Sequence, residues 1–328
     1  MNIIKPSVEI MQHIKNPQKH IESIARTCYK SNDLITEDSN KKFITSLRNR
    51  KHWAMLEHYI FIYEVNDNFI KNYISYARTL NISLQYMKIT NIKERYVISF
   101  SARTLLDLYD IVNYCDASEY VIESFKEQTE KLMKQCVYDY GCKELFNQDP
   151  HNSIFFTSIS LSYLENNMTE EEFMTHGWKS VKFICDRGVS HEIVRHRDAS
   201  FAQESTRYCN YSKDKFGTEL TIIEPCFFNK DDQKYKFWKE SMQHSEDYYF
   251  YLVDIDATPQ EARSVLPNSL KTEIIMTARN YEFAHFFELR CDPAAHPQMR
   301  ELAIPLYEQF CGESKVFNNY ISKFNILG

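Results

Sequence analysis

Glycine is scarce in this chain, and the scarcity limits which folds and ligand sites the sequence can form. Only six glycines occur in 328 residues: Gly141, Gly177, Gly188, Gly217, Gly312 and Gly328. No two of them are spaced to build Gly-x-Gly-x-x-Gly or a P-loop, in which glycines let backbone amides surround a phosphate. Rossmann dinucleotide-binding folds and P-loop enzymes are therefore excluded, and any bound phosphate must be held by charged side chains.

The composition is that of a globular protein without a nucleic-acid or membrane partner. Apolar residues make up 43% of the chain and charged residues 26%. The net charge of −6 lacks the basic excess of general nucleic-acid binders. No apolar run approaches the ~18 residues that span a bilayer, and the N-terminus does not resemble a signal peptide. We therefore expect no nucleic-acid partner and no membrane association.

Cysteine usage indicates a reducing compartment. The nine cysteines are odd in number, scattered, and free of any Cys-x-x-Cys pair. This pattern is typical of reduced thiols in a cytosol rather than of a disulfide framework or a zinc ribbon. We expect a cytoplasmic location.

Hydrophobic periodicity predicts helices and strands that do not alternate regularly, which indicates the α+β class. We expect a single main domain with a central mixed or antiparallel sheet flanked by helices. Strands are predicted near residues 58–65, in "SVKFICDRG" and in "TELTIIEP", and residues 195–207 are predicted as a loop. The C-terminal part is predicted to be mostly helical, with helices at 231–255, 259–264, 268–288 and 296–311.

Residues 66–178 read as a largely helical insertion in a main domain formed by residues 1–65 and 179–328. Helical periodicity covers residues 67–82, 101–114 and 121–140, and "SIFFTSISLSY" is predicted as a strand pair or one long strand. No linker rich in proline or glycine separates this block, so we expect it to pack on the main domain. A similarity between residues 98–109 and 275–286 is attributed to two amphipathic helices, and no repeat is expected.

His191, Glu192 and His196 come close to a zinc-protease motif, but their spacing is wrong for it. The motif His-Glu-x-x-His places two histidines four residues apart, about 40° apart around a helix. A spacing of five residues separates the two side chains by about 140°, so they cannot converge on one ion. We therefore expect no metal site.

The densest polar group of the sequence lies between residues 195 and 207. It contains Arg195, His196, Arg197, Ser200, Gln203, Ser205, Thr206 and Arg207. Guanidinium groups form bidentate hydrogen bonds with phosphates, and neighbouring hydroxyls can complete the site. The alternative is a solvated ion-pair network with Asp198 and Glu204. The density of the group, its position after a helix and the acidity of the remaining chain favour a site for an anionic ligand.

Arg-His-Arg, seven further residues and then Ser205 form the most specific pattern in the sequence, extended by Arg207 and Tyr208. This pattern is similar to the signature of the flavin-dependent thymidylate synthase family. Four further segments resemble that family in the same order: "ARTCYKS" (25–31), "HWAMLEH" (52–58), "ARSVLP" (262–267) and "HFFELRCDPAAHPQMRE" (285–301). The resemblance covers roughly residues 1–65 and 179–311 and leaves the block 66–178 outside it.

The resemblance implies a role for each matched residue. FAD would be held by Glu57, Arg195, His196, Arg197, Gln203, Arg279, Asn280 and His285. The substrate dUMP would be bound by Glu192, Arg195, Gln203, Glu204, Ser205, Thr206, Arg207, Arg263 and Arg290. His52 would lie near the folate and the flavin. Arg290 would contact the uracil ring and favour loss of its N3 proton, which makes it the predicted catalytic residue. The family's Asn-x-Arg before His285 is displaced here, where Arg279, Asn280 and Tyr281 stand.

The implied reaction is the reductive methylation of dUMP to dTMP, with methylenetetrahydrofolate as one-carbon donor, FAD as redox cofactor and NADPH as reductant. The resemblance also implies a homotetramer whose neighbouring subunits complete each site. Two alternatives remain open. Cys226 in "EPCFF" could act as a nucleophile, as in flavin-free thymidylate synthases. The chain could also be a nucleotide- or nucleic-acid-binding protein of the same fold without synthase activity.

Overall fold

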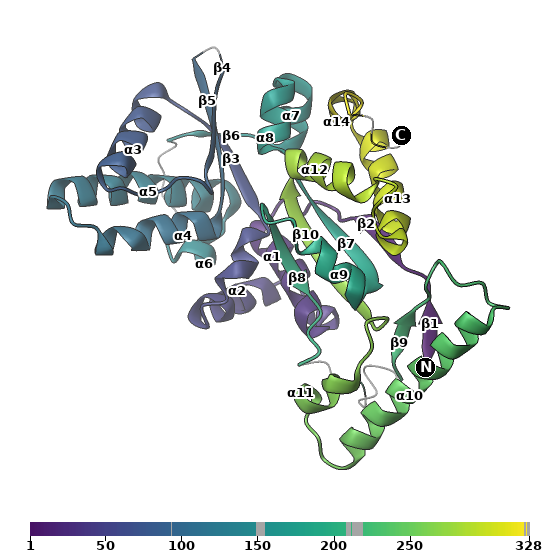
Figure 1. Cartoon of the computed structure of the whole chain (residues 1–328). Helices are drawn as coiled ribbons and strands as arrows, with labels where there is room; N and C mark the ends of the chain where they lie inside the picture. The colour runs from purple at the N-terminus through teal and green to yellow at the C-terminus, as the bar shows by residue number, and fades with distance from the viewer. Residues whose placement is uncertain (93, 149–154, 208–210, 212–218, 325, 327–328) are drawn as a thin grey trace.

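The computed structural model describes the whole chain apart from residues 93, 149–154, 208–210, 212–218, 325 and 327–328. Helices and mainly antiparallel sheets are combined in the described residues (Figure 1), which confirms the predicted α+β class. The central sheet has the strand order β2 (Ser7–Ile10), β7 (Trp178–Asp186), β10 (Lys271–Arg279) and β8 (Ala199–Gln203). A second sheet has the order β4 (Lys88–Ile92), β5 (Arg95–Ser101), β3 (Ile60–Val65) and β6 (Thr157–Ser158), and β1 (Asn2–Ile4) pairs in parallel with β9 (Thr221–Ile223).

Strand β10 lies inside the central sheet, in a region where the sequence predicted a helix over residues 268–288. That prediction is wrong for its first half, because residues 271–279 pair along their whole length with β7 and over part of it with β8. All but one residue of β10 are buried. Its apolar residues Ile274, Ile275 and Met276 are consecutive, and periodicity does not distinguish such a short run in a buried strand from one in a buried helix. The second half of the prediction holds, since a helix begins at Asn280.

Residues 66–178 contribute most of the second sheet as well as helices. Helices were found where periodicity predicted them, but strands β4 and β5 were not predicted. Strand β5 pairs with β4 on one side and with β3 on the other, which ties this block to the N-terminal part. In the described residues of "SIFFTSISLSY" the predicted strand is reduced to β6, and a helix follows it; residues 153–154 lie outside the described part. The division into a main domain and an insertion stays a prediction.

The helices of the described residues surround these sheets (Figure 1). In chain order they are α1 (Pro17–Ala25), α2 (Ser39–Asn49), α3 (Asp67–Thr79), α4 (Ala102–Ile111), α5 (Glu119–Tyr140), α6 (Lys143–Phe146), α7 (Leu161–Asn167), α8 (Glu170–His176), α9 (Arg187–Ile193), α10 (Gln233–Asp254), α11 (Pro259–Ala262), α12 (Asn280–Arg290), α13 (Pro297–Glu313) and α14 (Lys315–Ile321). Short 3₁₀ turns are η1 (Arg26–Tyr29), η2 (Asn32–Leu34), η3 (Trp53–Glu57), η4 (Val112–Tyr114) and η6 (Arg263–Val265). Helices α3 to α6 gather around the second sheet, and α13 contacts β2 of the central sheet.

One hydrophobic core joins the two four-stranded sheets. Phe61 and Phe100 of the second sheet and Phe183 and Met276 of the central sheet are fully buried in the same cluster. A smaller cluster forms around Tyr249 under α10 and α11. Because close-packed cores resist deformation, the large core fixes how side chains on the two sheets face one another.

Candidate active site

The segment 195–207 follows α9 and runs along the edge of the central sheet. The predicted loop is only partly correct, since residues 199–203 form strand β8. Ala199 lies opposite Ala278 of β10, and Gln203 lies opposite Ile274. Pairing with β10 therefore fixes the middle of the segment and leaves Arg195 to Asp198 in the turn before it.

His196 is buried in a polar cluster between α9 and α12. Its Nδ1 lies 3.2 Å from Oε1 of Glu282, and its Nε2 accepts a hydrogen bond from Nε of Arg290 over 3.1 Å. An arginine Nε always carries its hydrogen, so the proton of the imidazole lies on Nδ1, from which it is donated to Glu282. Both ring nitrogens are thereby used, and the orientation of the ring is fixed.

Arg290 keeps hydrogen-bonding capacity for a ligand. Besides the bond to His196, it donates to Oε2 and to the backbone carbonyl of Glu192, each over 3.0 Å. These bonds use three of the five N–H groups of the guanidinium and leave one on each terminal nitrogen. Because two residues hold the guanidinium in place, these two donors can meet a planar ligand group without reorganisation.

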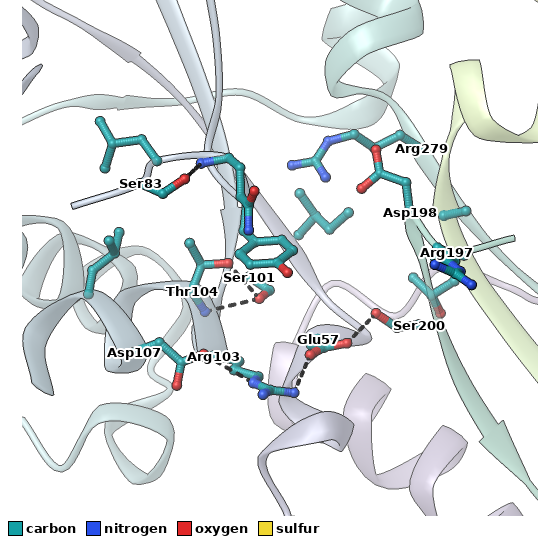
Figure 2. Close-up of a pocket in the computed structure, with 18 of the residues that line it drawn as sticks. Glu57, Ser83, Ser101, Arg103, Thr104, Asp107, Arg197, Asp198, Ser200 and Arg279 are labelled. Carbon is teal, nitrogen blue, oxygen red and sulfur yellow. Dashed lines mark hydrogen bonds and ion pairs between the residues drawn. The ribbon is translucent and has the colours of Figure 1, made fainter. Parts of the chain in front are cut away.

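A cavity of about 430 Å³ is lined in part by Arg197 to Ser200, the residues that follow His196 in the chain. Its lining includes the predicted flavin residues Glu57, Arg197 and Arg279. Glu57 is held by two hydrogen bonds of 2.6 Å, one from Ser200 Oγ and one from Arg103 Nη1 (Figure 2). Figure 2 shows that the two donors reach Glu57 from different parts of the chain, so its carboxylate is oriented at the cavity wall.

Arg279 is the last residue of β10 and reaches the cavity from a buried position. Its Nη2 donates to the carbonyl and the hydroxyl oxygen of Ser99, both over 3.1 Å, while its Nε has no partner in the described residues. Burial lowers the pKa of Arg279 to about 10, against the opposing effect of Asp198, so the group keeps its charge at neutral pH. Its neighbour Asn280 does not line the cavity and donates instead to the carbonyl of Phe173.

The predicted phosphate residues lie at the other end of β8 and on η6. Arg207 and Arg263 are exposed, Ser205 is half-buried and Thr206 is buried. Glu204 is buried, and its carboxylate meets Lys271 Nζ at 3.1 Å and Lys30 Nζ at 3.3 Å. Glu204 is thus neutralised within the chain. Tyr208 of the sequence motif lies outside the described residues.

His52 lies in a second, more open cavity of about 690 Å³. Its Nδ1 is 3.4 Å from the hydroxyl of Tyr29, and Cys28 also lines this cavity. Arg103 lines both cavities, so the predicted folate side and the predicted flavin side are neighbours.

The structure brings His196, Arg290 and Glu192 into direct contact and groups Glu57, Arg197 and Arg279 around one cavity. Gln203 donates to the hydroxyls of Ser190 on α9 and Thr272 on β10. Arg195 and His285 are exposed. Sequence reasoning missed Glu282, which holds His196, and Arg103, which holds Glu57. The sequence feature that could have identified Arg103 was the similarity between residues 98–109 and 275–286, which was attributed to two amphipathic helices.

His191 is exposed whereas His196 is buried, so the two histidines do not face one site. Within the described residues, no group of three or more His, Cys, Asp or Glu side chains is arranged to hold a metal ion. None of the helices in this part of the chain combines the length and the apolar character needed to cross a membrane.

Comparison with known proteins identifies relatives of this chain. The family model described as "Thymidylate synthase complementing protein" matches residues 9–179 and residues 167–313. The flavin-dependent thymidylate synthase of Geobacter sulfurreducens is 37% identical over 151 residues, which are 46% of this chain and 62% of that protein. The enzyme of the same name from Pyrococcus furiosus is 35% identical over 125 residues, 38% of this chain and 50% of that protein. The matched region therefore spans half to about three fifths of the length of these curated relatives.

Proposed function

Because the chain belongs to the thymidylate synthase complementing protein family, as its resemblance to flavin-dependent thymidylate synthases predicted, we propose that it converts dUMP to dTMP by reductive methylation. Methylenetetrahydrofolate is the proposed one-carbon donor and NADPH the proposed reductant. The observation that carries the proposal is the cluster in which His196 and Glu192 hold Arg290 with two N–H groups free for a planar ring.

FAD is the proposed redox cofactor, and the residues around the cavity of Glu57 fit an anionic dinucleotide. Arg195 and Arg197 are exposed cations that pair with no acidic side chain in the described residues, and the buried Nε of Arg279 has no partner there. The chain lacks glycine loops for phosphates, so such side chains must supply the positive charge. We assign to FAD the residues Glu57, Arg195, His196, Arg197, Gln203, Arg279, Asn280 and His285. A bound flavin supplies the hydride that completes the methyl group.

The protein's own contribution is to bind and polarise the uracil ring. The two free N–H groups of Arg290 are proposed to contact the ring and to stabilise the negative charge that develops when N3 loses its proton. His196, Glu282 and Glu192 keep the guanidinium oriented for this task. No covalent protein nucleophile is needed, so Ser205 serves as a phosphate ligand.

The phosphate of dUMP is proposed to bind to the exposed end of β8 and to η6. The residues assigned to dUMP are Glu192, Arg195, Gln203, Glu204, Ser205, Thr206, Arg207, Arg263 and Arg290, with His52 on the folate side. We propose that these residues come from neighbouring subunits of a homotetramer, as the resemblance to the family implies. The cytoplasmic location stays a prediction from cysteine usage.

The first test is the visible absorption spectrum of the purified protein with FAD added, before and after anaerobic NADPH. We expect flavin bands that remain with the protein after gel filtration and bleach on reduction, followed by dTMP formation when dUMP and methylenetetrahydrofolate are supplied. A protein that binds dUMP but stays colourless with FAD would instead be a nucleotide-binding protein of this fold without synthase activity.

A further inference from the structure

Three strands of each four-stranded sheet have the same order and the same connections in the described residues. In the central sheet, β7 leads into α9 and then β8, and β10 leads into α12. In the second sheet, β3 leads into α3 and then β4, and β5 leads into α4. The orders β8-β10-β7 and β4-β5-β3 correspond position by position, and every neighbouring pair is antiparallel. The fourth strand differs, since β2 precedes the other strands of its sheet in the chain and β6 follows those of the second sheet.

The pairing registers also correspond. Ser101 lies opposite Ile60 in the second sheet, and Thr277 lies opposite Ser180 in the central sheet. Five residues earlier on β5 and β10, Tyr96 lies opposite Val65 and Thr272 lies opposite Cys185. A single alignment of the two units therefore matches both pairs of strands.

The connections that follow β3 and β7, the first strands of the two units, also correspond. The side chain of Asn66 accepts a hydrogen bond from the amide of Phe69 over 2.8 Å and caps α3. The side chain of Asp186 accepts one from the amide of Val189 over the same distance and caps α9. A register slip of one residue would turn the buried face of each strand to solvent. The agreement of the pairing registers and helix caps therefore strongly constrains how the two units can be aligned.

The structural alignment exposes a sequence match. It places Ala102 and Arg103 on Ala278 and Arg279, and Ile98 on Ile274. The family model independently matches residues 9–179 and residues 167–313, two overlapping ranges of similar length. The similarity first attributed to two amphipathic helices is therefore a repeated strand–helix unit.

The cavity beside Glu57 is lined by corresponding residues of both units. Ile98 pairs with Ile89 and its counterpart Ile274 pairs with Gln203, which aligns β4 with β8. Counting back from these strands, residues 83–86 correspond to residues 197–200, and both stretches line the cavity. Figure 2 shows Ser83 and Asp107 on one side of this space and Arg197, Asp198 and Arg279 on the other.

The two walls differ in chemistry. The positions of Arg195, His196 and Arg197 are occupied in the other unit by Asn81, Ile82 and Ser83, and Leu84 and Tyr86 stand where the central unit has Asp198 and Ser200. Arg103 is the cation of this wall, and it already pairs with Glu57 and, over 3.1 Å, with Asp107. On one wall, Arg197 and Arg279 make no salt bridge in the described residues. The facing wall combines the paired Arg103 and Asp107 with the apolar and aromatic side chains of Leu84 and Tyr86.

We propose that residues 60–111 are an internal copy of the unit 180–290 that lacks counterparts of Arg195, His196 and Arg197, and that its stretch Ser83–Tyr86 forms the ring-binding wall of a site for one anionic, ring-bearing ligand. The anionic part of the ligand faces Arg197 and Arg279, and the ring lies against Leu84 and Tyr86. Aromatic side chains stack on planar rings regardless of charge, whereas the guanidinium groups select the anion. The site accepts one ligand per chain because the arginines without a salt bridge in the described residues lie on one wall only.

This inference rests on the proposed function in one respect, since FAD is the probe that tests it. Tyr86 suits the test because its side chain is 65% exposed and makes no hydrogen bond or ring contact in the described residues. Its truncation therefore leaves the fold intact, which circular dichroism checks. Arg78, an exposed residue of α3 outside the cavity, provides the matched control Arg78→Ala.

The experiment titrates each variant with FAD and follows flavin fluorescence at low and high KCl. We expect one FAD per chain for the wild type, affinity about tenfold weaker for Tyr86→Ala, and near wild-type affinity for Tyr86→Phe and Arg78→Ala. The salt dependence of binding stays unchanged in Tyr86→Ala and becomes shallower in Arg197→Ala, because only the second change removes a charge.

Two results would overturn the inference. If Tyr86→Ala binds FAD as the wild type does, or if each chain binds two FAD molecules, the copied unit does not form a ring-binding wall. In either case, weaker FAD binding by the Arg197→Ala variant would still support the proposed function. A wild-type chain that binds no FAD would instead remove the proposed function and this inference with it.

Discussion

The Nε of Arg290, at the end of α12, donates a hydrogen bond over 3.1 Å to Nε2 of His196, which lies 94 positions earlier in the chain. The contact joins the Arg-His-Arg segment to the predicted catalytic arginine. It also fixes the imidazole proton on Nδ1, toward Glu282, and leaves two N–H groups of Arg290 free. His196 is thus placed to orient Arg290, in addition to any contact that it makes with a cofactor.

Replacing Arg290 by lysine tests this arrangement. Lysine keeps the charge that pairs with Glu192 but lacks the planar fork, so we expect the rate of dTMP formation to fall by about 100-fold or more. FAD binding should change little, because Arg290 does not line the cavity beside Glu57. Single-turnover dTMP formation and the flavin absorbance of the same sample give the two readouts. A variant purified without flavin would show that Arg290 holds the cofactor instead.

Arg207→Ala tests the phosphate role of the exposed end of β8. A charge-assisted hydrogen bond contributes about 1.5–3 kcal/mol, so the apparent KM for dUMP should rise by about 10- to 150-fold. The rate at saturating dUMP should fall much less, since the phosphate contact is equal in the ground and transition states. Steady-state kinetics over a range of dUMP concentrations measures both values, with Arg78→Ala as the control. Unchanged dUMP affinity would refute the assignment.

Cys226→Ser separates the proposed mechanism from one with a cysteine nucleophile. Cys226 is exposed, but partial desolvation, together with the nearby carboxylate of Glu301, raises the pKa of its thiol and so reduces its thiolate fraction at neutral pH. We expect the variant to keep activity within about twofold of the wild type. Complete loss of dTMP formation in a folded, flavin-bound variant would support the cysteine mechanism.

Two buried histidines should make stability depend on pH. His58 Nδ1 lies 2.7 Å from Thr277 Oγ1, which lies 2.7 Å from Ser180 Oγ, and His20 Nε2 is 3.4 Å from that hydroxyl. Burial lowers the pKa of His58 to about 4, and burial with the neighbouring His13 and His58 lowers that of His20 to about 3. Both groups are neutral in the folded chain, whereas in the unfolded chain they take up a proton near pH ~6.5.

The folded pKa values lie below the unfolded ones, so the stabilisation is complete above pH ~6.5 and is lost as the pH falls toward about 4. Each histidine should lower the free energy of unfolding by up to about 1.4 kcal/mol per pH unit in this window. Urea unfolding followed by tryptophan fluorescence at about pH 7.5 and about pH 5 measures the change. His58→Gln should show a shallower dependence. Equal pH dependence in both proteins would mean that His58 is not held neutral.

Local sequence signals predicted much of the fold and of the site. Amphipathic periodicity located α3, α5 and α10, because one face of each helix is solvated. The Arg-His-Arg segment and its spacing to Ser205 predicted the family, since those side chains carry the chemistry directly. Periodicity failed at β10, because its consecutive apolar residues Ile274 to Met276 interrupt the alternation that marks a strand, and its polar residues are buried rather than solvated.

The sequence by itself determined the class of fold, the absence of glycine-based phosphate loops and the identity of the cationic segment, all of which depend on residues close together in the chain. Only the tertiary structure decided which distant residues meet: Glu282 and Arg290 at His196, Arg103 at Glu57, and two sheets with a matching three-stranded unit around one cavity. Such contacts are set by how a shared hydrophobic core packs the sheets together, and no local pattern encodes them.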